Sequence, residues 1–534
     1  MQAMILQVFF HEKLMASMAE APLPPYVLLL LLLVMVLPYC LFAGTRRSSA
    51  ASSSRCNLPP SPPRLPVIGH MHLVGSNPHV SLDKLSKEYA ADGGLMLLQL
   101  GQVRNLVVSS SRAAEAVLRT HDHVFASRPP SAIADILANG SSNIAFAPYS
   151  EYWRQARKLV ATHLLSAKKV SSLRRAREAE VSVAIAKIQE AVAAGATVDM
   201  SELLGSYVND VLCRAVSGES FREDGRNKLF RELAAGNSAQ YAGFHLEDYF
   251  PSLAKVNLLR GVVSSKTKKL KERWDKLLDE IIHDHANKSP PLHHHQDADF
   301  VDVLLSRQQE YNLTKQNVNA ILMDMFAAGS DTSYIVLEFA LAELMRKPRL
   351  MAKLQAEVRN RNSTDQLVSE EHLMNSMPFL KAVVKETLRL HPPVPLLLPR
   401  VSMARCDDVN GYTIPADTRV IVNAWALGRD ARYWEDPEEF MPERWFVDST
   451  NDADFIGGLD FRLLPFGAGR RVCPGTNFGM ASVEIMLASL VSCFDWELPA
   501  GMEEDDVDLT GVFGLTMFRK EKLYLVPRQH NTAS

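Results

Sequence analysis

Apolar and polar positions repeat with two different periods along the chain. Residues 95–110, LMLLQLGQVRNLVVSS, alternate with the two-residue period of a strand and predict a β-hairpin. Most of residues 111–390 instead repeats with the 3.6-residue period of a helix. The pattern therefore predicts a mainly α-helical fold with a minor β-sheet region.

One helical segment is unusually long. Residues 314–345 continue the helical pattern until Pro348, a length of roughly 48 Å at 1.5 Å per residue. The centre of this segment, MFAAGSDTS at 325–333, contains residues that are unfavourable inside a helix. We therefore expect the helix to be opened at its midpoint.

A second helical segment, PFLKAVVKETLRL at 378–390, stops before His391 and Pro392. It carries Glu386 and Arg389 three positions apart, which places both side chains on one helix face. The sequence therefore predicts a pair of opposite charges within this helix.

The N-terminal part of the chain contains an apolar run. Residues 26–44, YVLLLLLLVMVLPYCLFAG, are uncharged over about the length that spans a hydrocarbon core. Arg46 and Arg47 follow at once, so the positive-inside rule places the large C-terminal part in the cytosol. A cleaved signal peptide is the alternative, disfavoured by the length of the run and by its basic flank.

These features divide the chain into four regions. Prolines are frequent in LPPSPPRLPVIGH at 58–70, and they stiffen the chain between the anchor and the remainder. Translation that starts at Met15 or Met18 is a further hypothesis. The predicted regions are a leader (1–25), a transmembrane anchor (26–44), a linker with a proline-rich hinge (45–70) and a catalytic domain (71–534).

Charge and cysteine usage narrow the function. The 534-residue chain has a formal net charge of -3, which argues against general binding of nucleic acids. Its six cysteines are scattered instead of spaced as in a disulfide scaffold, so a reducing compartment is favoured. The histidines of NKSPPLHHHQDA at 287–298 are either metal ligands or, as we favour, part of a solvated loop.

A glycine-rich loop, PFGAGRRVCPG at 465–475, presents Cys473. A zinc site would need further Cys or His residues at ligand spacing, and none follow. A nucleophile would need a basic partner, whereas the neighbours Arg470 and Arg471 cannot accept a proton. What remains is a thiolate offered, beside backbone amides, to a metal that the chain does not otherwise ligate.

The loop resembles the haem loop of the cytochrome P450 family. The family pattern F-x-x-G-x-R-x-C-x-G is matched at every fixed position, by Phe466, Gly469, Arg471, Cys473 and Gly475. Further segments occur in family order: Trp153-x-x-x-Arg157, AGSDTS, Glu386-x-x-Arg389 and MPERW with Arg444. The resemblance covers nearly the whole chain and implies a cytochrome P450 fold with an N-terminal transmembrane helix, of the plant microsomal class.

The resemblance assigns roles to residues around a b-type haem (heme b). Cys473 is expected to ligate the iron as a thiolate. Phe466 and Gly475 belong to the same cofactor loop. Trp153, Arg157, Arg400 and Arg471 are expected to reach the haem propionates through indole and guanidinium donors.

Other roles implied by the family lie outside the loop. Asp331 and Thr332 are expected to deliver protons to the distal oxygen, the alternative being that Thr332 only bonds back to a helix carbonyl. Glu386, Arg389 and Arg444 are expected to form a buried structural network. Segments such as 131–146 are expected to line the substrate pocket, with six individual candidates: Phe326, Ala328, Val394, Leu397, Leu515 and Thr516.

The implied reaction is the hydroxylation of a small hydrophobic or aromatic metabolite with O2. Electrons are expected from NADPH through the membrane-bound NADPH-cytochrome P450 reductase, with cytochrome b5 as a further partner, at the endoplasmic reticulum membrane. Exposed charges for docking the reductase are expected at Arg154, Lys158 and Arg470.

A weaker resemblance to the grass monooxygenases of the benzoxazinoid pathway favours an indole-derived substrate. Terpenoids and phenolics remain alternatives on the same scaffold. A haem-thiolate enzyme that isomerises or dehydrates hydroperoxides is disfavoured by the intact Asp331-Thr332 pair. A haem-binding carrier or sensor without turnover is the alternative of another class.

Overall fold

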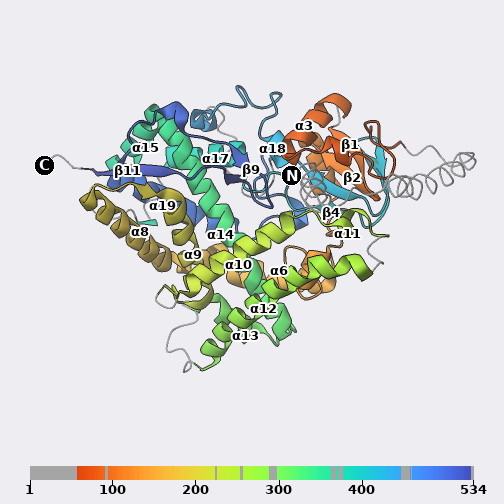
Figure 1. Ribbon diagram of the computed structural model, residues 1–534, viewed down its shortest axis with the longest axis horizontal. Coiled ribbons are helices and arrows are strands. Elements are labelled where there is room, and N and C mark those ends of the chain that lie inside the picture. The colour runs from red at the N-terminus through yellow and green to blue at the C-terminus, as the bar shows by residue number, and fades with distance from the viewer. Residues whose placement is uncertain are drawn as a thin grey trace, which may run out of the picture. The chain divides into compact units, whose positions relative to one another are not determined.

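The computed structural model describes residues 57–90, 94–222, 225–252, 257–287, 298–361, 369–370, 377–446, 458 and 460–530 (Figure 1). The predicted leader and transmembrane anchor, most of the linker and most of the histidine-containing loop lie outside these residues. The chain divides into two compact units, each assembled from separate segments. Unit 1 comprises Met1–Pro129, Phe244–Arg260 and Leu396–Leu427, and unit 2 comprises Pro130–Gly243, Gly261–Pro395 and Gly428–Ser534.

Unit 1 is built on a four-stranded sheet. Strands β1 (Leu95–Leu100) and β2 (Val103–Val108) pair antiparallel, which confirms the predicted hairpin. Strand β2 also runs parallel to β7 (Arg419–Val422), and β7 runs antiparallel to β4 (Arg400–Val401). In register, Leu95 lies opposite Val108, Asn105 opposite Arg419, and Arg400 opposite Val420. The sheet therefore joins residues that are far apart in the sequence.

The apolar side chains of β1 explain why the sheet is stable in unit 1. Met96, Leu98 and Leu100 are buried with Leu82 and Leu85 of α3 (Pro78–Tyr89) in one apolar cluster. The other elements of unit 1 are η1 (Met71–Leu73), α4 (Ser111–Glu115), the short π-helix η2 (Ala116–Thr120), α11 (Leu246–Tyr249), β5 (Cys406–Val409), β6 (Tyr412–Ile414) and α18 (Ala424–Leu427).

Unit 2 is mainly helical and is organised around one long helix, α14 (Lys315–Arg346). The Thr314 hydroxyl accepts the backbone N–H of Asn317 at 3.2 Å and so caps the start of the helix. Pro348 begins the next helix, as the sequence predicted for the end of this segment. Helix α14 packs most extensively against α9 (Met200–Ser217), α10 (Arg226–Ala242), α17 (Pro378–Leu390) and α19 (Thr476–Cys493).

The prediction that the helix is opened at its midpoint is wrong, because α14 is continuous through 325–333. The hydroxyls of Ser330 and Thr332 bond back to the carbonyls of Phe326 and Ala328, one turn earlier. Gly329 has a packing role: a Cβ atom there would lie 2.7 Å from Cδ2 of Leu212 on α9. The small and polar residues thus allow close helix packing without breaking the helix.

The remaining elements of unit 2 surround these helices (Figure 1). Its β-structure comprises β11 (Tyr524–Gln529), which pairs with both β3 (Val198–Asp199) and β8 (Phe494–Glu497), and the pair of β9 (Gly511–Val512) and β10 (Phe518–Arg519). Its other helices are α5 (Ala132–Leu137), α6 (Glu151–Leu159), η3 (Val160–Leu164), α7 (Ala167–Ser172), α8 (Arg174–Ala194), α12 (Asn257–Asn287, which begins in unit 1), α13 (Phe300–Arg307), α15 (Pro348–Arg361), η5 (Pro442–Phe446), η6 (Gly469–Arg471) and η7 (Glu504–Asp506).

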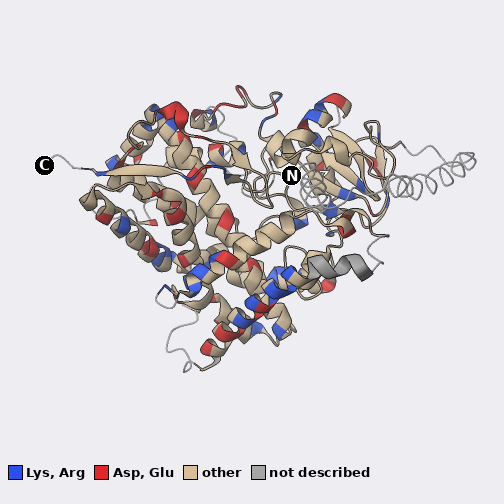
Figure 2. Ribbon diagram, viewed as in Figure 1, with Lys and Arg blue, Asp and Glu red and all other residues tan. Residues whose placement is uncertain are grey.

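Two helices of the described part of the chain, α14 and α19, are long and apolar enough to cross a membrane. Most residues in their apolar windows are buried inside the protein, as expected for core helices. Figure 2 shows charged residues spread along α8 and α12, whereas the ribbon of α19 is largely uncharged. The core of unit 2 therefore rests on α14 and α19.

Candidate functional site

The cysteine loop has a backbone shape that requires glycine. Gly467 and Gly469 both adopt a φ of +67°, in the left-handed region that residues with a Cβ rarely occupy. The N–H of Cys473 donates to the carbonyl of Phe466 at 2.9 Å, which closes the loop. The described cysteines Cys213, Cys406, Cys473 and Cys493 form no disulfide bond, and Cys473 is the exposed one among them. The loop therefore presents an accessible sulfur.

Opposing influences act on the thiol of Cys473. The protein packed around the loop raises its pKa, whereas the N–H of Gly475, the charge of Arg157 and the hydroxyl of Thr476 lower it. The accessible face of the side chain matters more for ligation than the raised pKa, because a coordinating metal deprotonates a thiol. The loop already supplies the amide and the positive charge that stabilise the resulting thiolate.

Helix α6 brings two of the predicted cofactor residues to this loop. Ser150 caps the helix by accepting the N–H of Trp153 at 3.2 Å. Arg157, one turn after Trp153, donates to the carbonyl of Val472, next to Cys473. The sequence spacing Trp153-x-x-x-Arg157 therefore places both side chains on the face of α6 that meets the cysteine loop.

The side chains of Trp153 and Arg471 both donate hydrogen bonds to carbonyls of one short segment, residues 144–147. The indole N–H of Trp153 donates to the carbonyl of Ile144 at 3.0 Å. Arg471 donates to the same carbonyl at 3.3 Å and to the carbonyl of Ala147 at 2.6 Å. The guanidinium also lies 3.9 Å from the centre of the Trp153 ring. Both side chains are thus held in place by protein groups.

Arg400, the remaining predicted propionate ligand, belongs to unit 1. It is buried and pairs with Asp122 at 2.8 Å. Arg128 lies in the same unit and donates to the carbonyls of Leu398 and Pro399 at 2.7 and 2.8 Å. Sequence reasoning missed Asp122 and Arg128, because no spacing signal links them to residues about 270 positions later.

The structure brings Glu386, Arg389 and Arg444 into one network in unit 2. Glu386 and Arg389 are fully buried and form a two-point ion pair at 2.9 and 2.7 Å. Arg389 also donates to three carbonyls, and Glu386 accepts from Arg444 at 3.0 Å. Further bonds to Glu386 come from the N–H of Met441 and the indole of Trp445. Every bond expected of a buried charge pair is present.

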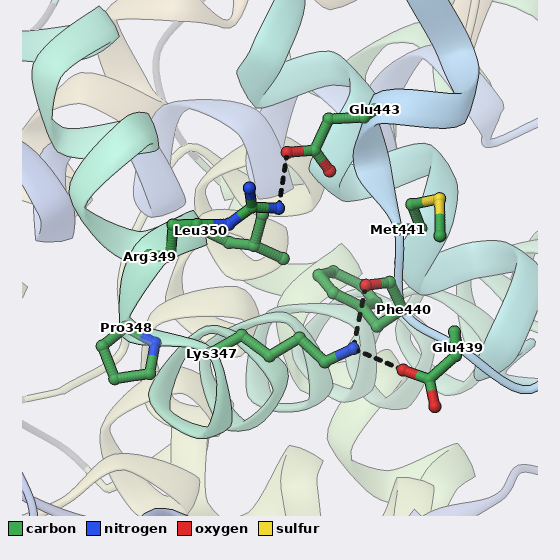
Figure 3. A pocket seen from close by; sticks show the side chains of 8 residues that line it. All are labelled: Lys347, Pro348, Arg349, Leu350, Glu439, Phe440, Met441 and Glu443. Carbon is green, nitrogen blue, oxygen red and sulfur yellow. Dashed lines mark hydrogen bonds and ion pairs between the residues drawn. The ribbon is translucent and has the colours of Figure 1, made fainter.

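A surface pocket of about 320 Å³ borders this network (Figure 3). Lys347 bonds to Glu439 at 2.8 Å and to the carbonyl of Phe440 at 3.2 Å across it, and Arg349 faces Glu443 at 3.5 Å. The charges that line the pocket are thus paired with one another. It contains none of the predicted catalytic residues.

Asp331 lies beside a second pocket of unit 2, with a volume of about 470 Å³. Its carboxylate accepts the hydroxyl of Ser238 at 2.9 Å and is 9% exposed. Burial raises the pKa of Asp331, while the Ser238 bond and the charge of Arg231 lower it. Arg231 and Glu202 line the same pocket and pair with each other. Asp331 therefore combines a buried carboxyl with a nearby polar space.

Thr332, which was predicted to deliver protons together with Asp331, lies on an accessible strip of α14 formed by Ala328 and Thr332. Ala328 is exposed and Thr332 is half-buried, although most of the helix is buried. The hydroxyl of Thr332 donates to the carbonyl of Ala328 at 3.0 Å, the alternative that the sequence left open. A Cβ at Gly479 of α19 would lie 3.5 Å from Oγ of the neighbouring Ser333. The helix that follows Cys473 thus meets the centre of α14.

The pocket candidates separate into different environments. Phe326 is 1% exposed and stacks on Phe230 at 3.8 Å, within a cluster that includes Trp274. Val394 and Leu515 are half-buried in unit 2.

The other two candidates have unusual local features. Leu397, in unit 1, is half-buried and adopts a φ of +50°, a strained conformation for leucine. Thr516 is buried, and its hydroxyl has no hydrogen-bond partner among the described residues. Both features are frequent where a protein holds a ligand, which is consistent with a pocket role.

These residues fit a haem. An accessible thiol stands next to the cationic Arg157, in a loop whose glycines let the backbone approach a flat ligand. The helix that starts after this loop meets α14, whose accessible strip contains a hydroxyl. This donor set, one thiolate with no second protein ligand at its side, suits an iron that is otherwise held by a macrocycle.

Comparison with known families decides the identity. The model of the family described as Cytochrome P450 matches residues 59–526. The chain belongs to the cytochrome P450 family. It is 51% identical to an indole-2-monooxygenase of Zea mays, over 98% of this chain and 98% of the relative. It is also 51% identical to a 3-hydroxyindolin-2-one monooxygenase of Zea mays, over 93% of this chain and 94% of the relative. The chain is thus a cytochrome P450 monooxygenase.

A solved structure supports the same assignment of fold. A zebra fish cytochrome P450 determined with progesterone superposes with a TM-score of 0.70 at 26% identity, covering 84% of this chain and 99% of that chain. The family implies a haem-thiolate iron, and relatives of this class use O2 and redox partners. Plant members of this class are typically anchored in the endoplasmic reticulum membrane.

Proposed function

We propose that the chain holds a b-type haem through the thiolate of Cys473 and hydroxylates a small aromatic metabolite. The observation that carries the chemistry is the accessible sulfur of Cys473 in a loop closed on Phe466 and flanked by Arg157. When bound, the haem supplies the activation of O2. One oxygen atom enters a C–H bond of the substrate as a hydroxyl, and the other leaves as water with two electrons from NADPH and two protons.

The residues around the haem would hold it by charge and packing. Arg157 and Arg471 would carry positive charge near the thiolate and the propionates. Trp153 would act through its ring, which lies against the guanidinium of Arg471, because its single indole N–H donates to the carbonyl of Ile144. Arg400 would contribute from its own unit, while Phe466 and Gly475 belong to the loop that carries Cys473. In the Glu386, Arg389 and Arg444 network the charged groups bond to one another and to backbone carbonyls, so its role would be to hold α17 and the segment before the loop in place.

Asp331 and Thr332 would handle protons. Burial raises the pKa of Asp331, so its carboxyl is protonated at a higher pH than that of an exposed aspartate. The adjacent pocket of about 470 Å³ offers room for water that can return a proton to its carboxylate oxygens. The hydroxyl oxygen of Thr332 keeps lone pairs for accepting a proton donor even while it donates to Ala328.

The substrate is proposed from the relatives. Among the relatives at 49 to 51% identity, three are named indole-2-monooxygenase, 3-hydroxyindolin-2-one monooxygenase and indolin-2-one monooxygenase. An indole-derived benzoxazinoid precursor is therefore the leading substrate, ahead of terpenoids and phenolics. Phe326, Ala328, Val394, Leu397, Leu515 and Thr516 remain pocket candidates.

Electrons would come from NADPH-cytochrome P450 reductase, with cytochrome b5 as a further donor. Arg154, Lys158 and Arg470 are exposed in unit 2, as a docking surface for an acidic partner requires. Residues 26–44 would anchor the chain as a single pass in the endoplasmic reticulum membrane, with the catalytic part in the cytosol.

The test is turnover in membranes that contain this chain and the reductase. Indole, indolin-2-one and 3-hydroxyindolin-2-one are supplied with NADPH and labelled O2, together with one terpenoid and one phenolic series. We expect a product with one labelled oxygen from an indole-type compound. A labelled product only from terpenoids or phenolics would overturn the substrate proposal, and haem-loaded protein without NADPH-dependent product would overturn the enzyme.

A further inference from the structure

A second buried carboxylate, Asp324, lies on α14 two turns before Asp331. It is 7% exposed and forms no ion pair with a Lys or Arg among the described residues. Its two oxygens instead accept the side-chain amide of Asn143 at 2.7 Å, the backbone N–H of Ala145 at 3.0 Å and the backbone N–H of Ile144. All three donors belong to one short turn, residues 143–147, which we call the Asn143 turn.

Asn143 itself uses both ends of its amide. Because a carboxylate only accepts hydrogen bonds, the nitrogen of the amide must face Asp324. The amide oxygen accepts the N–H of Phe146 at 3.2 Å, and the backbone oxygen of Asn143 accepts the N–H of Ala147 at 3.1 Å. The turn is therefore closed by its own bonds and fastened to α14 by Asp324.

The carbonyls of the same turn hold two residues of the proposed haem site. Ile144 accepts the indole N–H of Trp153 and one N–H of Arg471, and Ala147 accepts a second N–H of Arg471. The ring of Phe146 stacks on Tyr241 of α10 at 4.3 Å. Donor groups of the turn thus face Asp324, and its acceptors face Arg471 and Trp153.

A buried carboxylate without a cation is costly unless its hydrogen bonds compensate for the loss of water. Burial raises the pKa of Asp324 to about 6, and the bonds to Ala145 and Asn143 lower it. Above this value the side chain is ionised, and bonds to an ionised acceptor are stronger than neutral ones. An asparagine in its place would direct an NH2 group at one or more of these donors.

We propose that Asp324 is a positioning residue of the haem site: from α14 it clamps the Asn143 turn, and the turn orients Arg471 and Trp153. The proposal rests on the proposed function only in its reference to haem. The clamp itself is a property of the protein.

The first experiment measures deuterium exchange of backbone amides in the haem-loaded protein at neutral pH. In Asp324→Asn we expect the amides of Ala145 and Phe146 to exchange about tenfold faster or more, because a charge-assisted bond is lost. Exchange in α17 should be unchanged. Equal exchange at the turn in wild type and variant would overturn the clamp, and so would faster exchange spread evenly over unit 2.

The second readout is the rate at which haem passes to excess apomyoglobin. Faster release is expected from Asp324→Asn, because Arg471 and Trp153 lose their support. Unchanged release together with a loosened turn would overturn the connection to the haem site. A chain that binds no haem refutes the proposed function, whereas the exchange data still test the clamp.

Three further variants sharpen the test. The exchange of partners, Asn143→Asp with Asp324→Asn, can re-form the side-chain bond and should restore slow exchange at Ala145. Asn143→Ala leaves α14 intact and should loosen the turn by itself, even if Asp324→Asn fails to fold. Glu484→Gln changes a half-buried carboxyl of α19 in the same way and should leave the turn unchanged. Failure of both Asn143 variants to alter exchange as stated would contradict the proposal.

Discussion

Two buried charged regions of unit 2, on α17 and on α14, differ in how fully their polar atoms are paired. Glu386 and Arg389 on α17 are 0% exposed, and six groups beyond the pair itself bond to them. Asp331 on α14 has one side-chain partner, Ser238, and borders a pocket. A charge with complete pairing stabilises the fold, and a carboxyl with spare lone pairs and adjacent space can exchange protons.

The same contrast applies within α14. Asp324 accepts hydrogen bonds from three donors of the Asn143 turn, whereas Asp331 accepts one from Ser238 and lines a pocket. The two carboxyls lie on one helix and both have raised pKa values, so the pKa alone does not separate them. Their hydrogen-bond partners do.

The largest effect is expected in the α17 network. Arg389→Ala leaves Glu386 buried and unpaired, which should cost about 3 to 5 kcal/mol and yield little haem-loaded protein. Haem content per folded protein is the measurement. Arg432→Ala, which removes a surface pair with Asp430, should cost less than about 1 kcal/mol. Full haem content in Arg389→Ala would contradict the claim that the fully paired network on α17 stabilises the fold.

The next effect depends on pH and concerns Asp324. Its pKa of about 6 in the folded protein exceeds the ordinary 3.8, so the folded state binds more protons between pH 4 and pH 6. Its contribution to the free energy of unfolding therefore falls as pH rises through this window, by about 3 kcal/mol in total. The groups that face it, Tyr152 on α6 and Tyr241 on α10, have raised pKa values and stay neutral there.

The measurement is the difference in unfolding free energy between wild type and Asp324→Asn across this pH range. The variant has no carboxyl to titrate, so the advantage of wild type should shrink as pH rises. If the difference is constant or grows with pH, burial does not raise the pKa of Asp324 in the folded protein.

Loss of the proton donor should reduce turnover more than stability. Asp331→Asn is expected to lower product formation roughly a hundredfold, the usual contribution of a positioned acid or base. Product per NADPH consumed is measured beside thermal stability. Glu232 lines the same pocket and pairs with Arg273 at the surface, so the variant Glu232→Gln serves as the matched control. Equal turnover in Asp331→Asn and wild type would remove Asp331 from the proton path.

The smallest effect is expected at Gly329. A methyl group there meets Leu212, which costs more than the gain in helix propensity, so Gly329→Ala should lose about 1 kcal/mol. In a Leu212→Ala background the clash is absent, and the same change should become neutral or stabilising. A destabilisation that persists in that background would favour a special backbone role for the glycine.

Local patterns predicted the local structure well. The hairpin β1–β2 and the helix α17 follow from two-residue alternation and from a segment bracketed by prolines. The i,i+3 spacing of Glu386 and Arg389 likewise predicted their pairing. These features depend on residues that are neighbours in sequence.

Long-range partners could not be predicted from the sequence. Asn143 and Asp324 are separated by 181 positions, and neither stands in a recognisable spacing. The glycine and polar residues at 325–333 predict a helix opening that the structure does not have, because the contact with Leu212 on α9 is invisible in the sequence. The stack of Phe326 on Phe230 is equally invisible, since only packing reveals it.

The role of Cys473 as the thiolate ligand of haem iron is the central claim. The most direct test is the ferrous carbon monoxide difference spectrum of membranes that contain this chain, beside Cys473→His. A strongly red-shifted Soret band in wild type that is lost in the variant is the predicted result. An unshifted band in folded, haem-loaded wild type would contradict thiolate ligation and with it the proposed chemistry.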